Sequence, residues 1–143
     1  MKKEKIKGID FKFLDYEFEI SEIESEEFVL RNIRKKICDK LEISLKLLED
    51  VMQPNGISAL IEVKELNDND GKKAFELYKQ IMIYLRKATE LFYEDSDKEN
   101  IEFIKEITKN WPDLKKGIID INKKLSKVWT KPSIKKEQLG YLG

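Results

Sequence analysis

Apolar residues recur at alternating steps of three and four along most of this chain, and that spacing places them on one face of an α-helix. The longest run covers residues 30–52, and Pro54-Asn55-Gly56 is expected to end it. Further helices are predicted over about residues 72–93 and 112–128. Amphipathic helices bury their apolar faces against one another. The sequence therefore predicts a mainly α fold, a small bundle of four to five helices.

Capping signals place several helix ends. Ser96-Asp97-Lys98-Glu99 has the spacing of a capping box and predicts the start of a shorter helix that ends at Trp111. Pro112 is then expected at the first position of the last helix, where its missing N–H costs nothing. Ser21 or Ser25 is expected to begin the longest helix, because acidic residues follow both.

The middle of the chain gives a weaker signal. Residues 57–66 are interpreted as a short helix started by Ser58, and a strand is the alternative. Asn67-Asp68-Asn69-Asp70-Gly71 is interpreted as a turn, because these residue types favour turns.

The first twenty residues follow a different pattern. Apolar and charged residues alternate there, and the parity changes across Leu14-Asp15, as a tight turn requires. We therefore predict a short β-hairpin over about residues 8–20. Its apolar side chains would share one face: Ile9, Phe11, Phe13, Tyr16, Phe18 and Ile20. A lone hairpin is marginal in water, so that face is expected to lie on the helices.

The length of 143 residues suits one domain, predicted over residues 1–129, and the aperiodic tail 130–143 is expected to be flexible. There is no run of about eighteen apolar residues, so we expect no membrane span. The first residues also lack the apolar stretch of a signal peptide. The single cysteine, Cys38, cannot form an internal disulfide, which favours a cytoplasmic location.

The absence of histidine excludes the commonest general base and the Glu-x-x-His motif of di-metal bundles. A chain with one cysteine also lacks the ligands of the usual structural zinc sites. No Gly-rich phosphate loop or serine nucleophile motif is present. We therefore expect no enzyme, no catalytic residue, no metal and no cofactor. Cys38 is interpreted as a packing residue, and Glu90, Glu94 and Asp95 as a solvated helix end.

The zero net charge hides an asymmetry. Residues 113–137 contain eight lysines and three acids, a charge of +5, and the first 112 residues carry −5. A basic last helix could contact a polyanion, and the candidate residues are Lys116, Lys123, Lys124 and Lys127. A nucleic-acid-associated or phage accessory subunit is therefore the alternative function. The balanced total and the scarcity of arginine make it the less favoured one.

The order of these features resembles the lambda-type tail assembly chaperones of long-tailed phages. The resemblance is carried by Ser21-Glu22-Ile23-Glu24-Ser25, at the start of a helix after a hairpin, and by Lys109-Asn110-Trp111-Pro112, before the last helix. It implies a non-enzymatic viral protein of the host cytoplasm. Such a protein shields an apolar helical tape measure protein and helps recruit tail tube subunits to it.

Large apolar residues at the ends of the expected elements are the candidates for contact with a protein partner. They are Phe92, Trp111, Trp129, Leu139, Tyr141 and Leu142. The alternative for the two tryptophans is ordinary burial in the core. Apolar helix faces of this kind are also compatible with a homo-oligomer.

Overall fold

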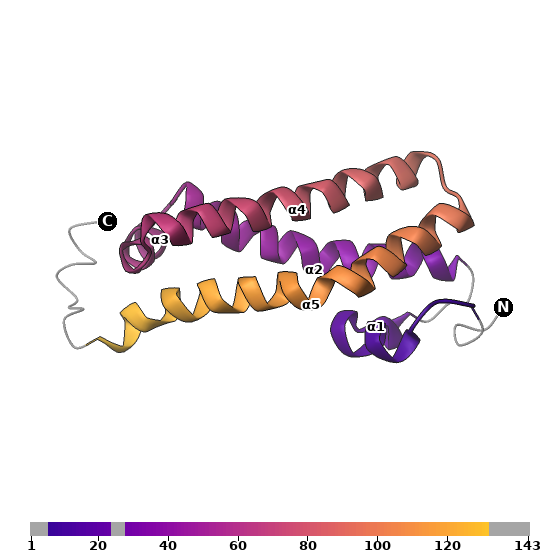
Figure 1. Cartoon of the computed structure of the whole chain (residues 1–143), viewed down its shortest axis with the longest axis horizontal. Helices are drawn as coiled ribbons and strands as arrows, with labels where there is room; N and C mark the ends of the chain where they lie inside the picture. The colour runs from indigo at the N-terminus through magenta and orange to yellow at the C-terminus, as the bar shows by residue number, and fades with distance from the viewer. Residues whose placement is uncertain (1–5, 24–27, 132–143) are drawn as a thin grey trace. The chain divides into compact units, whose positions relative to one another are not determined.

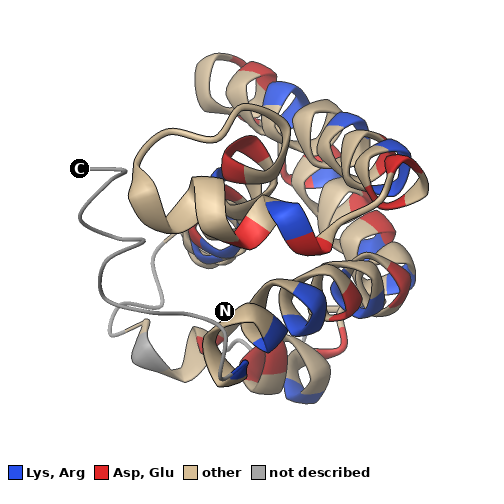
Figure 2. Ribbon diagram, turned by 90° about the vertical axis from the view of Figure 1, so that its left-hand side faces the viewer, with Lys and Arg blue, Asp and Glu red and all other residues tan. Residues whose placement is uncertain are grey.

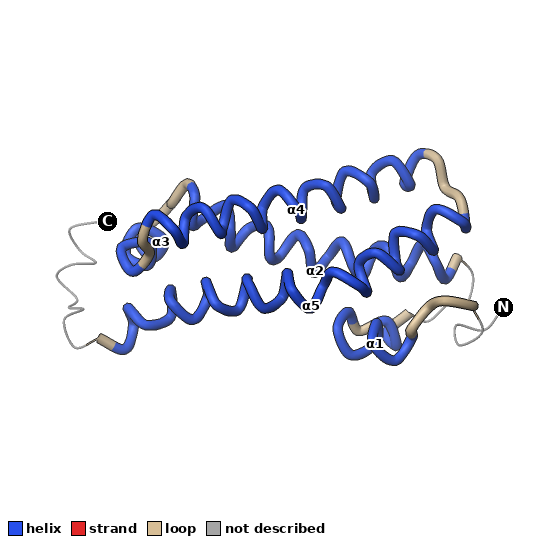
Figure 3. Tube along the Cα trace, in the orientation of Figure 1, coloured by secondary structure: helices blue, strands red, loops and turns tan. Residues whose placement is uncertain are grey.

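The computed structural model describes residues 6–23 and 28–131 of the chain. Within these ranges all regular structure is helical and no strand occurs, which confirms the mainly α prediction (Figures 1 and 3). The elements in chain order are α1 (Phe11–Phe18), η2 (Ile20–Glu22), α2 (Val29–Met52), α3 (Ile57–Glu62), η3 (Val63–Glu65), α4 (Asp68–Tyr93), α5 (Asp97–Lys127) and η4 (Val128–Thr130).

The chain divides into two compact units. Unit 1 comprises residues 1–43 and 81–113, and unit 2 comprises residues 44–80 and 114–143. The helices α2, α4 and α5 each contribute to both units, α1 and η2 belong to unit 1, and the other short elements belong to unit 2. The predicted boundary at residue 130 falls at the end of η4, and residues 132–143 of the predicted tail lie outside the described residues.

The N-terminal hairpin prediction is wrong, because residues 11–18 form the helix α1. The Asp10 side chain accepts a hydrogen bond from the Phe13 N–H, 3.0 Å away, and so caps the helix. Leu14, expected in the hairpin turn, is fully buried, whereas Tyr16, expected on the apolar face, is 82% exposed. Burial at the helical spacing of Leu14 and Phe18 outweighs the period-two alternation.

The start of α4 lies four residues before the predicted one, so the turn assigned to residues 67–71 is the first turn of a helix. Asn67 and Asp70 form a reciprocal cap. The Asp70 N–H donates to Asn67 Oδ1 at 2.8 Å, and the Asn67 N–H donates to Asp70 Oδ2 at 3.0 Å. Residues that favour turns thus act here as helix caps. The helical interpretation of residues 57–66 is confirmed by α3 and η3, but α3 begins at Ile57 after Gly56 and not at Ser58.

The helix α5 continues through Pro112, so the predicted break between two helices after Trp111 is wrong. Buried residues of α5, continued by Val128 of η4, form one seam across the proline at steps of three, four and seven: Ile104, Ile107, Trp111, Leu114, Ile121, Leu125 and Val128. Pro112 lies on the exposed side of the helix. The burial of a continuous seam outweighs the backbone hydrogen bond that proline removes.

Two other start signals had different outcomes. The capping box at Ser96 is confirmed, because the Glu99 N–H donates to Ser96 Oγ at 3.4 Å and α5 begins at Asp97. Ser21 begins no long helix, since residues 20–22 form a 3₁₀ turn followed by extended backbone at Ile23. Ser25 lies outside the described residues.

Unit 1 is held together around Trp111 and Arg34, both of them buried. The Trp111 ring lies 5.1 Å from that of Phe18, and its Nε1 donates to Glu17 Oε2 at 2.9 Å, so α1 is attached to α5. The Arg34 guanidinium donates to Asn100 Oδ1 at 2.6 Å. These polar contacts satisfy groups that would be costly to bury alone.

In the same unit, Asp95 in the loop between α4 and α5 contacts both α2 and α5. The Arg31 guanidinium bonds Asp95 Oδ2 at 2.6 Å, and the Asn100 amide donates to Asp95 Oδ1 at 2.6 Å. The hydrogen bond from Arg31, followed by that from Asn100, holds the pKa of Asp95 below its ordinary value of 3.8. Glu90, Glu94 and Asp95 are all exposed at the end of α4, as expected for a solvated helix end, and Asp95 also forms the ion pair with Arg31.

Unit 2 buries Leu48 and Val51 of α2, Ala59 and Ile61 of α3, Ala74 of α4 and the last part of the α5 seam. Polar contacts join the end of the described chain to the short elements. Trp129 Nε1 donates to Glu62 Oε2 at 2.8 Å, and Lys131 forms an ion pair with Glu65. None of the described helices has both the length and the apolar character needed to cross a membrane.

Candidate functional site

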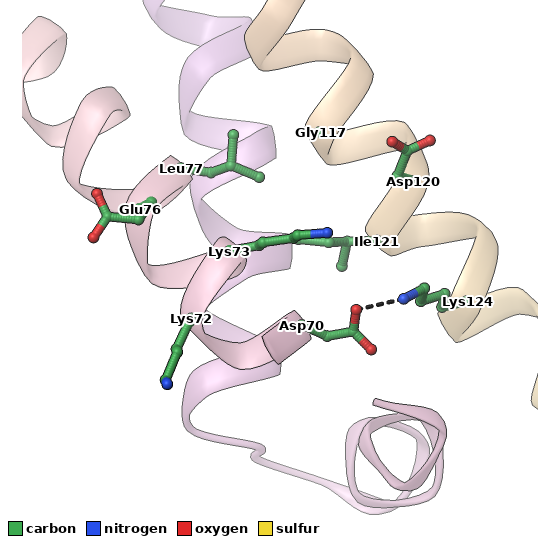
Figure 4. Close-up of a pocket in the computed structure, with 9 residues that line it drawn as sticks. All are labelled: Asp70, Lys72, Lys73, Glu76, Leu77, Gly117, Asp120, Ile121 and Lys124. Carbon is green, nitrogen blue, oxygen red and sulfur yellow. Dashed lines mark hydrogen bonds and ion pairs between the residues drawn. The ribbon is translucent and has the colours of Figure 1, made fainter. Parts of the chain in front are cut away.

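A groove runs between α4 and α5 in unit 2, with a volume of about 340 Å³ (Figure 4). Its floor is apolar, and charged side chains surround it. The lining residues are Asp70, Lys72, Lys73, Glu76, Leu77, Gly117, Asp120, Ile121 and Lys124. The first half of α4 supplies one wall, and the last half of α5 supplies the other.

The floor of the groove depends on Gly117. A Cβ atom at this position would lie 2.9 Å from Cδ2 of Leu77, closer than side chains pack. Glycine therefore lets α5 approach the Leu77 side chain on α4 and leaves the floor shallow there. Leu77 is half-buried and Ile121 is buried, so their side chains offer an apolar surface beside the exposed charges of the rim.

One end of the groove is fixed by an ion pair between Asp70 and Lys124. Asp70 is buried, and it also accepts a hydrogen bond from the Asn67 N–H. The hydrogen bond from Lys124, and then the one from Asn67, lowers the pKa of Asp70 from its ordinary value of 3.8. The carboxylate is therefore charged at neutral pH and locks the N-terminus of α4 to α5.

The other charges of the rim are less constrained. In Figure 4, Lys73 extends from α4 toward α5, whereas Lys72 and Glu76 point away from the groove. Glu76 forms an ion pair with Lys79 at 2.9 Å. No ion pair joins Lys73 or Asp120 to another residue of the described chain, and both are exposed. The groove thus carries a cation near Asp70 and an anion near Gly117.

The structure separates the aromatic residues predicted to contact a partner. Phe92 is 65% exposed at the end of α4 in unit 1, where its ring lies 5.1 Å from that of the exposed Tyr93. Trp111 is only 2% exposed, so its predicted partner-facing role gives way to the alternative of core burial. Trp129 is 43% exposed in unit 2, and Glu62 accepts a hydrogen bond from its indole N–H.

The other predicted contacts fall in different places. Leu139, Tyr141 and Leu142 lie outside the described residues. Of the four lysines proposed for a polyanion, Lys116, Lys123 and Lys127 are exposed on α5. The fourth, Lys124, is paired with Asp70 at the groove. Basic and acidic residues are interspersed along the helices in Figure 2.

The sequence does not predict the groove. The ion pair between Asp70 and Lys124 is not expected from it, because Asp70 lies in a predicted turn and Lys124 on a predicted polyanion surface. One local signal could have placed Asp70 in a helix. Asn67 and Asp70 are three residues apart, which is the spacing of a helix cap. The floor had no local signal, since the apposition of Leu77 and Gly117 depends on how α4 and α5 pair.

No group of three or more histidine, cysteine, aspartate or glutamate residues within 6–23 and 28–131 could hold a metal ion. Burial raises the pKa of the Cys38 thiol to about 11, so the reactive thiolate is scarce at neutral pH. An apolar floor with a charged rim is the kind of surface that can bind a ligand or a partner.

Comparison with family models, with curated proteins and with solved structures finds no significant match to this chain. The resemblance to tail assembly chaperones therefore rests on the two short sequences quoted above. Neither has its expected structural context, because residues 11–18 form a helix instead of a hairpin and α5 continues through Pro112. The candidate site rests on the geometry of unit 2.

Proposed function

We propose that this chain is a non-enzymatic protein-binding module that holds the apolar face of a partner helix in the α4–α5 groove. The observation that carries the proposal is the apolar floor of Leu77 and Ile121, where the Leu77 side chain packs against Gly117 of α5. Helix-in-groove binding uses a few apolar anchors spaced along one face of the partner. A volume of about 340 Å³ suits such anchors rather than a large ligand.

The biological partner that we propose is the apolar helical tape measure protein of a phage tail, with tail tube subunits as further partners. The support is the resemblance of the two short sequences, together with the apolar floor of the groove. The exposed Trp129, which belongs to the same unit as the groove, would add an apolar contact to a long partner. A chaperone of this kind keeps its client soluble without any chemical step, in agreement with the lack of histidine.

The groove is tested with a model peptide of roughly twenty residues that has leucines on one helical face and glutamine and serine on the other. Binding to the full chain is measured by fluorescence anisotropy. The variant Leu77→Asp removes the apolar floor and should weaken binding about tenfold or more, because burial of one leucine contributes about 1.5–3 kcal/mol.

The matched control is Ile83→Asp, which makes the same change at an exposed residue of α4 in unit 1. Circular dichroism at 222 nm verifies that both variants keep their helices. Equal binding by the two variants, or no binding by the unaltered chain, would rule out the groove as a helix-binding site. The client itself is tested by coexpression, in which the tape measure protein should stay soluble only with the unaltered chain.

The alternative function is polyanion binding by Lys116, Lys123 and Lys127, which are exposed on α5 and have no ion pair with another described residue. Nucleic-acid binding through these lysines should weaken steeply as salt rises, because counterions are released. Capture of an apolar helix should change little with salt. Tight, salt-sensitive DNA or RNA binding, lost in the variant Lys123→Glu, would favour the alternative.

A further inference from the structure

The charges around the groove define the partner more narrowly. We propose that the groove prefers an amphipathic helix with a carboxylate beside its apolar face, and that Lys73 is the residue that contacts this carboxylate. The inference rests on the proposed protein-binding function, because it specifies which partner the same groove accepts.

The first support is the charge at the Asp70 end of the groove. Asp70 is buried and already has two donors, Lys124 and the Asn67 N–H, and it lies in the first turn of α4, where a negative charge is stabilised. Lys73 lies near enough to help lower the pKa of Asp70, yet it forms no ion pair with it. One carboxylate thus faces two ammonium groups, and a single positive charge is left over at the edge of the apolar floor.

The second support is the direction of Lys73. In Figure 4 its side chain extends from α4 toward Ile121, whereas Lys72 on the same turn points away. A helix seated on Leu77 and Ile121 would therefore bring its flanking residues next to the Lys73 ammonium. A carboxylate at this flanking position of the bound helix would form an ion pair with Lys73, whereas a lysine at the same position would be repelled by it.

The third support is the charge of the whole unit. Unit 2 contains 13 basic and 9 acidic residues, whereas unit 1 contains 15 and 19. An acidic partner is thus attracted to the unit that holds the groove. Asp120, at the Gly117 end, opposes this locally, so the selection is expected for the flank that faces Lys73 and not for acidic peptides in general.

The experiment compares three versions of the model peptide that differ at one flanking position of the central turn: glutamate, glutamine or lysine. Binding to the full chain is measured at about 50 mM salt, where screening is weak. The glutamate peptide should bind about fivefold more tightly than the glutamine peptide, as an exposed ion pair allows, and the lysine peptide should bind most weakly.

Variants assign the preference to Lys73. The substitution Lys73→Gln should make the glutamate and glutamine peptides equal, and Lys73→Glu should reverse the order of the glutamate and lysine peptides. The control Lys123→Glu makes the same charge change on α5 at a residue outside the groove lining, and it should keep the original order.

The outcomes separate the two proposals. Equal binding of all three peptides would overturn the inference and leave helix binding intact. Absence of binding by every peptide would overturn both. An order that Lys73→Gln does not change would exclude Lys73 as the contact. Displacement of the peptides by dodecanoate at lower concentration than the glutamate peptide would show that the groove prefers a simple acyl carboxylate, which also contradicts the inference.

Discussion

The indole of Trp111 makes two contacts in the core of unit 1. Its ring packs on Phe18, and its N–H donates a hydrogen bond to the buried Glu17 carboxylate. The substitution Trp111→Phe keeps an aromatic ring but removes the donor. It should lower the free energy of unfolding by about 1–3 kcal/mol, the cost of a buried polar group that loses its partner. Urea denaturation followed by circular dichroism measures the change.

The control for that substitution is Trp129→Phe, since Trp129 donates to a carboxylate at an exposed position. Water can replace this hydrogen bond, so the loss should stay below about 0.5 kcal/mol. An equal loss in the two variants would mean that the Glu17 contact adds nothing beyond the packing of the ring.

Asp70 and Asp95 make stability depend on acid. Both carboxyls have a pKa below the ordinary 3.8 in the folded chain, so the unfolded chain takes up protons first as the pH falls. Their stabilising contribution is complete well above pH 3.8 and is lost as the pH drops through that value and below it. The free energy of unfolding, measured in urea at several pH values, should fall on the acid side.

The variant Asp70→Asn isolates one of these groups. It keeps an oxygen to accept from the Asn67 N–H but loses the ion pair with Lys124, whose side chain is 40% exposed. At neutral pH the loss should be about 1–2 kcal/mol, limited by that exposure, and the acid slope should become flatter. The exposed Asp68→Asn should alter neither. An unchanged slope in Asp70→Asn would contradict the assigned lock.

The continuity of α5 can be tested directly, because Pro112 lies inside this helix. Within a helix, proline costs about 3 kcal/mol relative to alanine, whereas at the first position of a helix it is well tolerated. The substitution Pro112→Ala should therefore raise the free energy of unfolding by about 1–3 kcal/mol if α5 is continuous. A neutral or destabilising effect would instead support two helices that meet at Trp111. Urea denaturation distinguishes the two results.

The long helices could be predicted because their seams are encoded locally: Leu30, Ile33, Ile37 and Leu41 recur at helical spacing and are all buried. The same rule applied across Pro112 would have joined the two predicted helices, since Trp111 and Leu114 keep the seam in step. At Pro112, the burial of this seam outweighs the preference of proline for the first position of a helix.

The segment α1 and the groove could not be predicted in this way. In residues 11–18 the alternation and the helical spacing coexist, and the choice depends on the burial of Leu14 and Glu17 against the rest of unit 1. The groove depends on which helix faces Gly117. Both features are tertiary, so no window of the sequence contains them.

Over the whole chain, the zero net charge separates into −4 for unit 1 and +4 for unit 2. Within unit 2, residues 44–80 contain 5 basic and 7 acidic residues, whereas residues 114–143 contain 8 and 2. The positive charge of unit 2 therefore comes from its C-terminal part, in agreement with the change of sign near residue 113 in the sequence. Any acidic partner is steered by that part of the unit. The exposed aromatic pair Phe92 and Tyr93 belongs to the acidic unit.

The two tryptophans provide one native probe for each unit, Trp111 in unit 1 and Trp129 in unit 2. The helices α2, α4 and α5 each pass through both units. If one unit unfolds, the segments of these helices that belong to it, about 9–17 residues each, lose their packing. Isolated helices of that length are marginal in water. We therefore expect both units to unfold in one transition. In the single-tryptophan variants Trp111→Phe and Trp129→Phe, the fluorescence midpoint in urea should coincide with the circular dichroism midpoint of the same variant. A fluorescence transition at a different urea concentration from the loss of helix in either variant would show that the units unfold independently.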